Sequence, residues 1–141
     1  MKNELLVFLI SASPFVELRG AIPFGIATGV GVWKVFIIAI LGNFIPIIPL
    51  LVFFKWAVTR LENMKGIGKL LKWWFKKVER KSKIVQLYGF WGLVLFVSIP
   101  FPGTGVWSGS IAATLLEFKL SRAFLAIFMG MVIAAILVTF G

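Results

Sequence analysis

Two stretches of the chain are apolar over the length needed to cross a lipid bilayer. Residues 32–54 carry one charge, Lys34, near their start, and residues 120–140 carry one, Arg122, also near their start. About 20 consecutive apolar residues span the hydrocarbon core as a helix. With 60% hydrophobic and 14% charged residues, a chain of 141 residues cannot bury its apolar surface as a soluble globule. We therefore predict an all-α integral membrane protein with transmembrane helices at 32–54 and 120–140.

The basic residues are concentrated between these two segments and predict the orientation of the chain. Ten of the 15 lysines and arginines lie within residues 55–83, where only Glu62 and Glu79 oppose them. A nucleic-acid-binding protein is also basic, but its basic face does not lie between two bilayer-length apolar segments. The positive-inside rule places this segment in the cytoplasm. We expect a multi-pass protein of the inner (plasma) membrane and no nucleic-acid partner.

The basic segment contains an amphipathic pattern. Apolar residues recur on one helical face and lysines on the other. The apolar face comprises Ile67, Leu70, Leu71, Trp74, Phe75 and Val78, and the basic face comprises Lys65, Lys69, Lys72 and Lys76. This pattern is typical of an interfacial helix whose lysines contact the headgroups of anionic lipids. The alternative is a linker whose charges only fix the topology.

The two remaining apolar stretches, residues 3–31 and 84–118, are interrupted near their middles by proline and glycine. These residues break or bend helices, and broken backbone at membrane depth is tolerated only beside protein or a water-filled cavity. We predict that each stretch forms a re-entrant helical hairpin. The predicted tip and hinge residues are Pro14, Pro23, Pro100, Pro102, Gly103 and Gly105. A four-helix bundle, in which both stretches cross the membrane, is the alternative.

The first repeat, residues 1–54, and the second repeat, residues 84–141, share one pattern. The matched positions are Pro14-Phe15 with Pro100-Phe101, Lys34 with Arg122, and Gly42 with Gly130. If residues 55–83 are cytoplasmic, the first hairpin enters from outside and the second from the cytoplasm. This predicts an inverted repeat of a hairpin plus a transmembrane helix, the arrangement of many secondary transporters.

Glu17 and Arg19 are the strongest candidates for function. Ionisable residues within an apolar membrane segment are costly and usually face a pathway or a partner. In a functional pair, Glu17 would bind and release a proton, while Arg19 would hold an anion or set the pKa of Glu17. The alternative is a salt bridge that only locks the hairpin tip. Thr104, Trp107 and Ser108 complete the predicted substrate- and proton-binding site, although the hydroxyls of Thr104 and Ser108 could instead satisfy loosened backbone.

The chain has neither cysteine nor histidine and no cluster of carboxylates. Disulfides, thiol chemistry and the usual zinc sites are therefore excluded. Few catalytic constellations remain. We expect no enzymatic activity, no metal and no cofactor.

Two sequence segments resemble signature stretches of a known family. Residues 13–25 read Ser-Pro-Phe-Val-Glu-Leu-Arg-Gly-Ala-Ile-Pro-Phe-Gly, and residues 99–109 read Ile-Pro-Phe-Pro-Gly-Thr-Gly-Val-Trp-Ser-Gly. Both look like the motifs of the small multidrug export protein family, and the resemblance covers nearly the whole chain. More distantly, the layout is similar to the DedA (VTT-domain) superfamily, which has paired re-entrant hairpins and includes proton-coupled lipid-carrier flippases and scramblases. Arginines that this superfamily often carries in its second hairpin are absent here.

These features together predict a small secondary transporter or lipid flippase. It would move an amphiphilic small molecule or lipid between two facing hairpins, with proton coupling through Glu17 as one option. The alternative is a non-transporting scaffold that organises membrane lipids through the amphipathic helix. Because two hairpins and two spans form a thin wall around any cavity, we also expect a homodimer or higher homo-oligomer, with two-fold symmetry the commonest.

Overall fold

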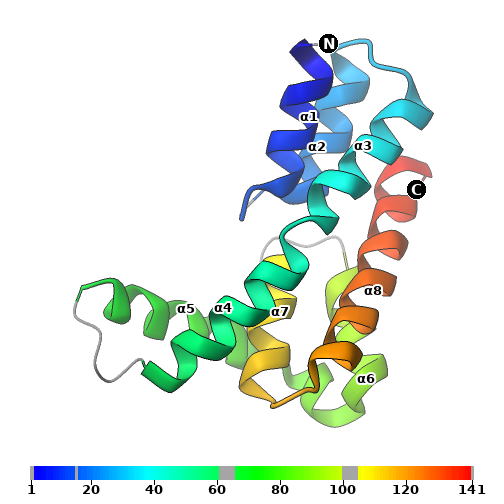
Figure 1. The fold of residues 1–141 in the computed structure, drawn as a ribbon. Helices are drawn as coiled ribbons and strands as arrows, with labels where there is room; N and C mark the ends of the chain where they lie inside the picture. The colour runs from blue at the N-terminus through cyan, green and yellow to red at the C-terminus, as the bar shows by residue number, and fades with distance from the viewer. Residues whose placement is uncertain (1, 15, 61–65, 100–104, 141) are drawn as a thin grey trace.

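The computed structural model describes residues 2–14, 16–60, 66–99 and 105–140. These ranges are helical and contain no strand, so the prediction of an all-α chain is confirmed. The helices are α1 (Lys2–Ala12), α2 (Glu17–Ala27), α3 (Val32–Phe44), α4 (Ile47–Arg60), α5 (Ile67–Lys81), α6 (Lys83–Ser98), α7 (Val106–Leu115) and α8 (Leu120–Phe140). Figure 1 shows their arrangement.

Two helical paths are long and apolar enough to cross a membrane. One is α8, with 21 residues, and the other is the 29-residue path Val32–Arg60 formed by α3 and α4. The helix is interrupted between α3 and α4 at Ile45 and Pro46, as expected for a proline within a span. Pro49 lies in the first turn of α4, where a missing N–H costs little. Helix α4 continues past residue 54, the predicted end of the span, to Arg60. Residues 55–60 contain no proline or glycine, and a basic residue is favourable in the last turn of a helix.

The two interrupted stretches form pairs of short helices. The helices α1 and α2 have 11 residues each and α7 has 10, so each is only about 15–17 Å long. Gly89, with φ of 59°, interrupts the longer α6. In Figure 1, α1 and α2 lie side by side at the end of the molecule that holds both termini, and α6 and α7 lie at the opposite end.

Gly42 and Gly130 make equivalent close contacts in the two halves of the chain. A Cβ on Gly42 of α3 would lie 2.5 Å from the carbonyl oxygen of Phe8 in α1. A Cβ on Gly130 of α8 would lie 2.7 Å from the carbonyl oxygen of Val94 in α6. Each glycine therefore lets its long helix pack directly on the backbone of the first hairpin helix in the same half.

The turns that follow α2 and α7 are also alike. After α2, Gly29 has φ of 90° and the Val30 amide donates to the Gly25 carbonyl at 3.0 Å. After α7, Glu117 has φ of 59° and the Phe118 amide donates to the Ala113 carbonyl at 2.9 Å. Both are left-handed helix ends of the Schellman type, and each leads directly into a long apolar helix.

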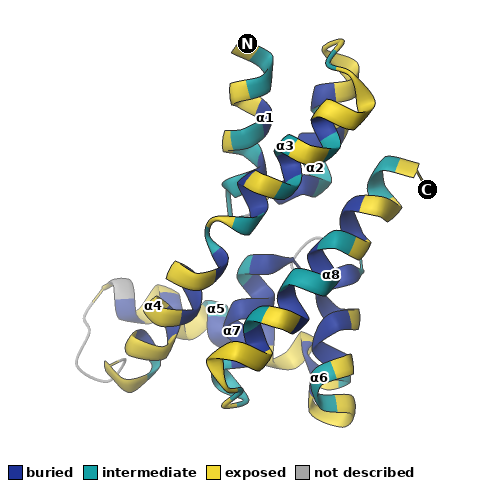
Figure 2. Cartoon of the chain, turned by 45° about the vertical axis from the view of Figure 1, so that its right-hand side comes forward, coloured by how far each residue is buried: buried dark blue, intermediate teal, exposed yellow. Residues whose placement is uncertain are grey.

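The basic segment forms an amphipathic helix, α5, that packs on protein. Its buried residues Leu71, Phe75 and Val78 are 6% exposed or less, and Phe54 of α4 makes edge-to-face contacts with Phe75 and Trp74. Most of the predicted apolar face is therefore covered by α4 and α7, whereas its member Leu70 is 62% exposed. An amphipathic stripe can pack on protein as well as on lipid. The opposite face is exposed in Figure 2 and includes Lys69, Lys72 and Lys76. Lys65 and the side chain of Ile67 lie outside the described part of the chain.

Candidate functional site

Glu17 is the first residue of α2 and has an unusual backbone conformation. Its φ is 53°, in the left-handed region that residues with a Cβ seldom adopt. On a regular helix, side chains two residues apart point in different directions. The left-handed start instead brings the Glu17 carboxylate to Arg19, where Oε2 accepts from Nη1 at 2.8 Å. The side chains of Glu17 and Arg19 are only 5% and 13% exposed.

The Glu17 carboxylate caps the start of α7 in the other hairpin. The Trp107 amide donates to Glu17 Oε1 at 2.9 Å, and the Val106 amide also hydrogen-bonds the carboxylate. These are the first two residues of α7, whose amides have no acceptor within their own helix. A carboxylate at this position also interacts favourably with the positive end of the helix dipole.

The Arg19 guanidinium binds the end of α6, on the other side of the same break. Its Nη2 donates to the carbonyl oxygens of Val97 at 2.9 Å and Ile99 at 2.7 Å. Cations are favourable at helix C-termini, where carbonyl groups lack partners. One ion pair at the start of α2 therefore holds the end of α6 and the start of α7, with each charge at the helix end that favours it.

Gly105 permits this close approach. A Cβ at this position would overlap the carboxylate of Glu17 and lie 2.5 Å from Nη1 of Arg19. Gly105 precedes the first residue of α7 and has φ of −85°, which any residue can adopt. The glycine is therefore required for space and not for backbone conformation.

Trp107 links the two hairpins to α5. Its indole Nε1 donates to the carbonyl oxygen of Ala12, at the end of α1, at 3.3 Å. Its ring is stacked on Trp74 of α5, with ring centroids 6.2 Å apart and planes 19° apart. The sequence pattern assigned Trp74 only to the apolar face of the amphipathic helix, so its contact with the candidate site was missed.

The structure places the other predicted site residues as follows. Pro14 lies in the turn between α1 and α2, and Ser108 is buried within α7. Pro23 is not at the tip: it lies inside α2, where it removes only one amide donor and the helix continues. The predicted residues outside the described ranges are Pro100, Pro102, Gly103 and Thr104. Among the described residues, no group of three His, Cys, Asp or Glu could hold a metal ion.

Two bilayer-length apolar paths, short paired helices and a buried ion pair at their junction define this chain as a helical membrane protein. The sequence model of the family described as "Putative small multi-drug export protein" matches residues 17–137. The chain belongs to this family, and the match includes the ion pair, the start of α7, the path Val32–Arg60 and most of α8. No curated protein and no solved structure matches the chain. The more distant similarity to the DedA superfamily stays a prediction from the sequence.

Proposed function

We propose that this protein is a secondary transporter that moves an amphiphilic small molecule or lipid across the inner membrane by alternating access. The observation that carries the proposal is the ion pair Glu17–Arg19, which belongs to one hairpin and binds both helix ends of the other. This junction serves as substrate site and gate. Membership of the export family supports a transporter in general, and the junction supports this particular mechanism.

The proposed topology is an inverted repeat of two re-entrant hairpins. Helices of 10 or 11 residues cover only about half of the ~30 Å hydrocarbon core, so α1–α2 and α7 fit re-entrant segments better than full spans. The contacts of Gly42 and Gly130 and the turns after α2 and α7 support two equivalent halves. With the basic segment in the cytoplasm, α1–α2 enters from outside and α6–α7 from inside.

The contacts at the junction describe a closed gate. Opening it separates the amides of Val106 and Trp107 from Glu17, and the carbonyls of Val97 and Ile99 from Arg19. A buried charge that loses its partner is costly. A substrate group or a proton must therefore take the place of the hydrogen-bond partners that Glu17 and Arg19 lose.

Protons and substrate act on the same carboxylate in this mechanism. A proton on Glu17 removes the charge that strengthens its hydrogen bonds with α7 and Arg19, and the two hairpins loosen. The cationic group of an amphiphile would bind the released Glu17 carboxylate. An anionic group would bind Arg19 and the free amides at the start of α7.

Transport in proteoliposomes tests this proposal. Ethidium, a lipophilic cation, and a fluorescently labelled phospholipid serve as probes under an imposed pH gradient. We expect gradient-driven movement of at least one probe by the wild type, and loss of the coupling in Glu17→Gln. Glu4→Gln is the matched control, because it removes a carboxylate of α1 whose ion pair with Lys34, at 3.5 Å, is partly exposed. Undiminished coupled transport by Glu17→Gln would remove Glu17 from the mechanism.

The alternative, a lipid-organising scaffold, depends on α5. The exposed lysines of α5 favour contact with anionic lipid, but most of its apolar face packs on protein. Replacing Lys69, Lys72 and Lys76 together with Gln, while flanking charges preserve the topology, separates the two functions. A scaffold would lose its function, whereas a transporter that works through the hairpin junction would retain most of its activity.

A further inference from the structure

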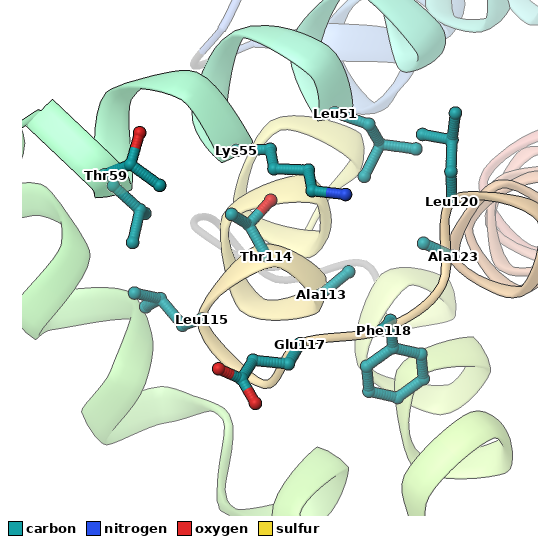
Figure 3. Close-up of a pocket in the computed structure, with 11 residues that line it drawn as sticks. Leu51, Lys55, Thr59, Ala113, Thr114, Leu115, Glu117, Phe118, Leu120 and Ala123 are labelled. Carbon is teal, nitrogen blue, oxygen red and sulfur yellow. The ribbon is translucent and has the colours of Figure 1, made fainter.

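A second site lies away from the hairpin junction, at the opposite end of α7. An open pocket of about 370 Å³ is lined by α4, the last turn of α7, the turn after it and the first turn of α8. Figure 3 shows this pocket. Nothing in the proposed transport mechanism uses it, because the junction involves Val106 and Trp107 at the start of α7.

The pocket holds two opposite charges that do not pair with each other. The ammonium of Lys55 on α4 points into the space, and Glu117 lines its edge in the turn between α7 and α8, with its carboxylate directed away from Lys55 (Figure 3). Both residues are exposed, so their charged groups can reach a ligand at the mouth of the pocket. Among the described residues, neither side chain has an ion-pair partner within 4.0 Å. An unpaired cation and an unpaired carboxylate on one pocket match a ligand that carries both charges.

The rest of the lining is mostly apolar. Leu51 and Val58 of α4 and Leu120 and Ala123 of α8 all line the pocket. A hydrocarbon chain that lies along these side chains stays in contact with apolar groups. The hydroxyl of Thr114 already donates to the Ser110 carbonyl at 2.8 Å, so Lys55 is the main donor to an anion.

The start of α8 adds a second attraction for an anion. This helix has 21 residues, and its first described backbone bond runs from the Ala123 amide to the Lys119 carbonyl at 2.9 Å. The amides of the preceding residues point out of the helix end and carry its positive partial charge. Leu120, the first residue of α8, lines the pocket, so this helix end and the Lys55 ammonium border the same space.

We propose that this pocket binds a zwitterionic phospholipid headgroup bearing a phosphate and a primary ammonium, as in phosphatidylethanolamine. Lys55 and the start of α8 bind the phosphate, Glu117 binds the ammonium, and an acyl chain lies along the apolar lining. The position of the pocket in the membrane rests on the topology proposed above, which places the end of α4 at the cytoplasmic surface. Lipid binding here is independent of Glu17 and of transport.

Native mass spectrometry of the purified protein tests this site. The probes are phosphatidylethanolamine, phosphatidylglycerol and phosphatidylcholine with identical acyl chains. We expect the ethanolamine lipid to bind best, and Lys55→Gln to weaken its binding about tenfold. Lys55→Arg should retain binding, because arginine also binds phosphate. Lys2→Gln, which removes an exposed lysine of α1, should have no effect and serves as the control.

Glu117→Gln distinguishes the headgroups. We expect it to weaken binding of the ethanolamine lipid about fivefold or more and to leave the glycerol lipid unchanged or bound more tightly, since a repulsive carboxylate is removed. Equal retention of lipid by Lys55→Gln and Lys2→Gln would overturn the proposal. So would equal weakening of both lipids by Glu117→Gln. Both readouts measure bound lipid, so neither depends on the outcome of the transport experiment.

Discussion

Replacing Gly105 with alanine tests the geometry of the hairpin junction. The new Cβ would occupy the position of the Glu17 carboxylate, so the carboxylate must leave the amides at the start of α7. Each charge-assisted hydrogen bond that breaks removes about 1.5–3 kcal/mol. Loss of both amide hydrogen bonds should therefore make Gly105→Ala lower the free energy of unfolding by about 3–6 kcal/mol, and the melting temperature by roughly 10–20 °C.

Gly31→Ala is the matched control for this substitution. Gly31 also precedes the first residue of a helix, α3, and its φ of −58° suits alanine. No atom lies within 4 Å of the position that its Cβ would occupy. Any general cost of alanine at such a position is therefore common to both variants. Unfolding in detergent micelles, followed by tryptophan fluorescence, gives the difference between them.

A double-mutant cycle isolates the clash itself. In a Glu17→Ala background, the carboxylate is absent, and the flexible end of Arg19 can move away from a Cβ at residue 105. The second substitution, Gly105→Ala, should then cost less than about 0.5 kcal/mol. An equal cost of Gly105→Ala in both backgrounds would refute the assignment of this glycine to the approach between the hairpins.

Three further predictions concern packing and assembly. Gly130→Ala should lower the free energy of unfolding by about 1–3 kcal/mol, because its Cβ would meet the backbone oxygen of Val94; thermal unfolding measures the loss. Trp74→Ala should cost about 1–2 kcal/mol by removing the stacking on Trp107, whereas Trp73→Ala should cost under about 0.5 kcal/mol because Trp73 is 57% exposed; denaturant unfolding compares them. Crosslinking in native membranes should give a dimer, and monomer alone would exclude the predicted homo-oligomer.

Much of the helical framework could be predicted from local sequence signals. Long apolar runs predicted α8 and the path through α3 and α4. Pro46 predicted the interruption between α3 and α4. Proline and glycine gave the break before α7, because their backbone effects are local. Pro23 was assigned wrongly for the same reason: a proline shows that one amide donor is missing, but not whether the surrounding helix ends.

The partners of the candidate site could be predicted only in part. Two charges in an apolar stretch indicated Glu17 and Arg19, because such residues need partners in a membrane. Their acceptors and donors in the second hairpin are mainly backbone groups, which exist at every residue and leave no sequence signature. The stacking of Trp74 on Trp107 was missed because an amphipathic pattern does not distinguish a lipid surface from a protein surface.

The proposed topology can be measured directly, since the chain contains no native cysteine. Single cysteines replace Lys2 and Thr28, at the start of α1 and the end of α2. In separate variants they replace Lys81 and Lys119, near the start of α6 and the end of α7. In right-side-out membrane vesicles, a membrane-impermeant maleimide should label the first two positions, and the other two only after permeabilisation. Labelling of residues 2 and 28 from opposite sides of the membrane would contradict a re-entrant first hairpin.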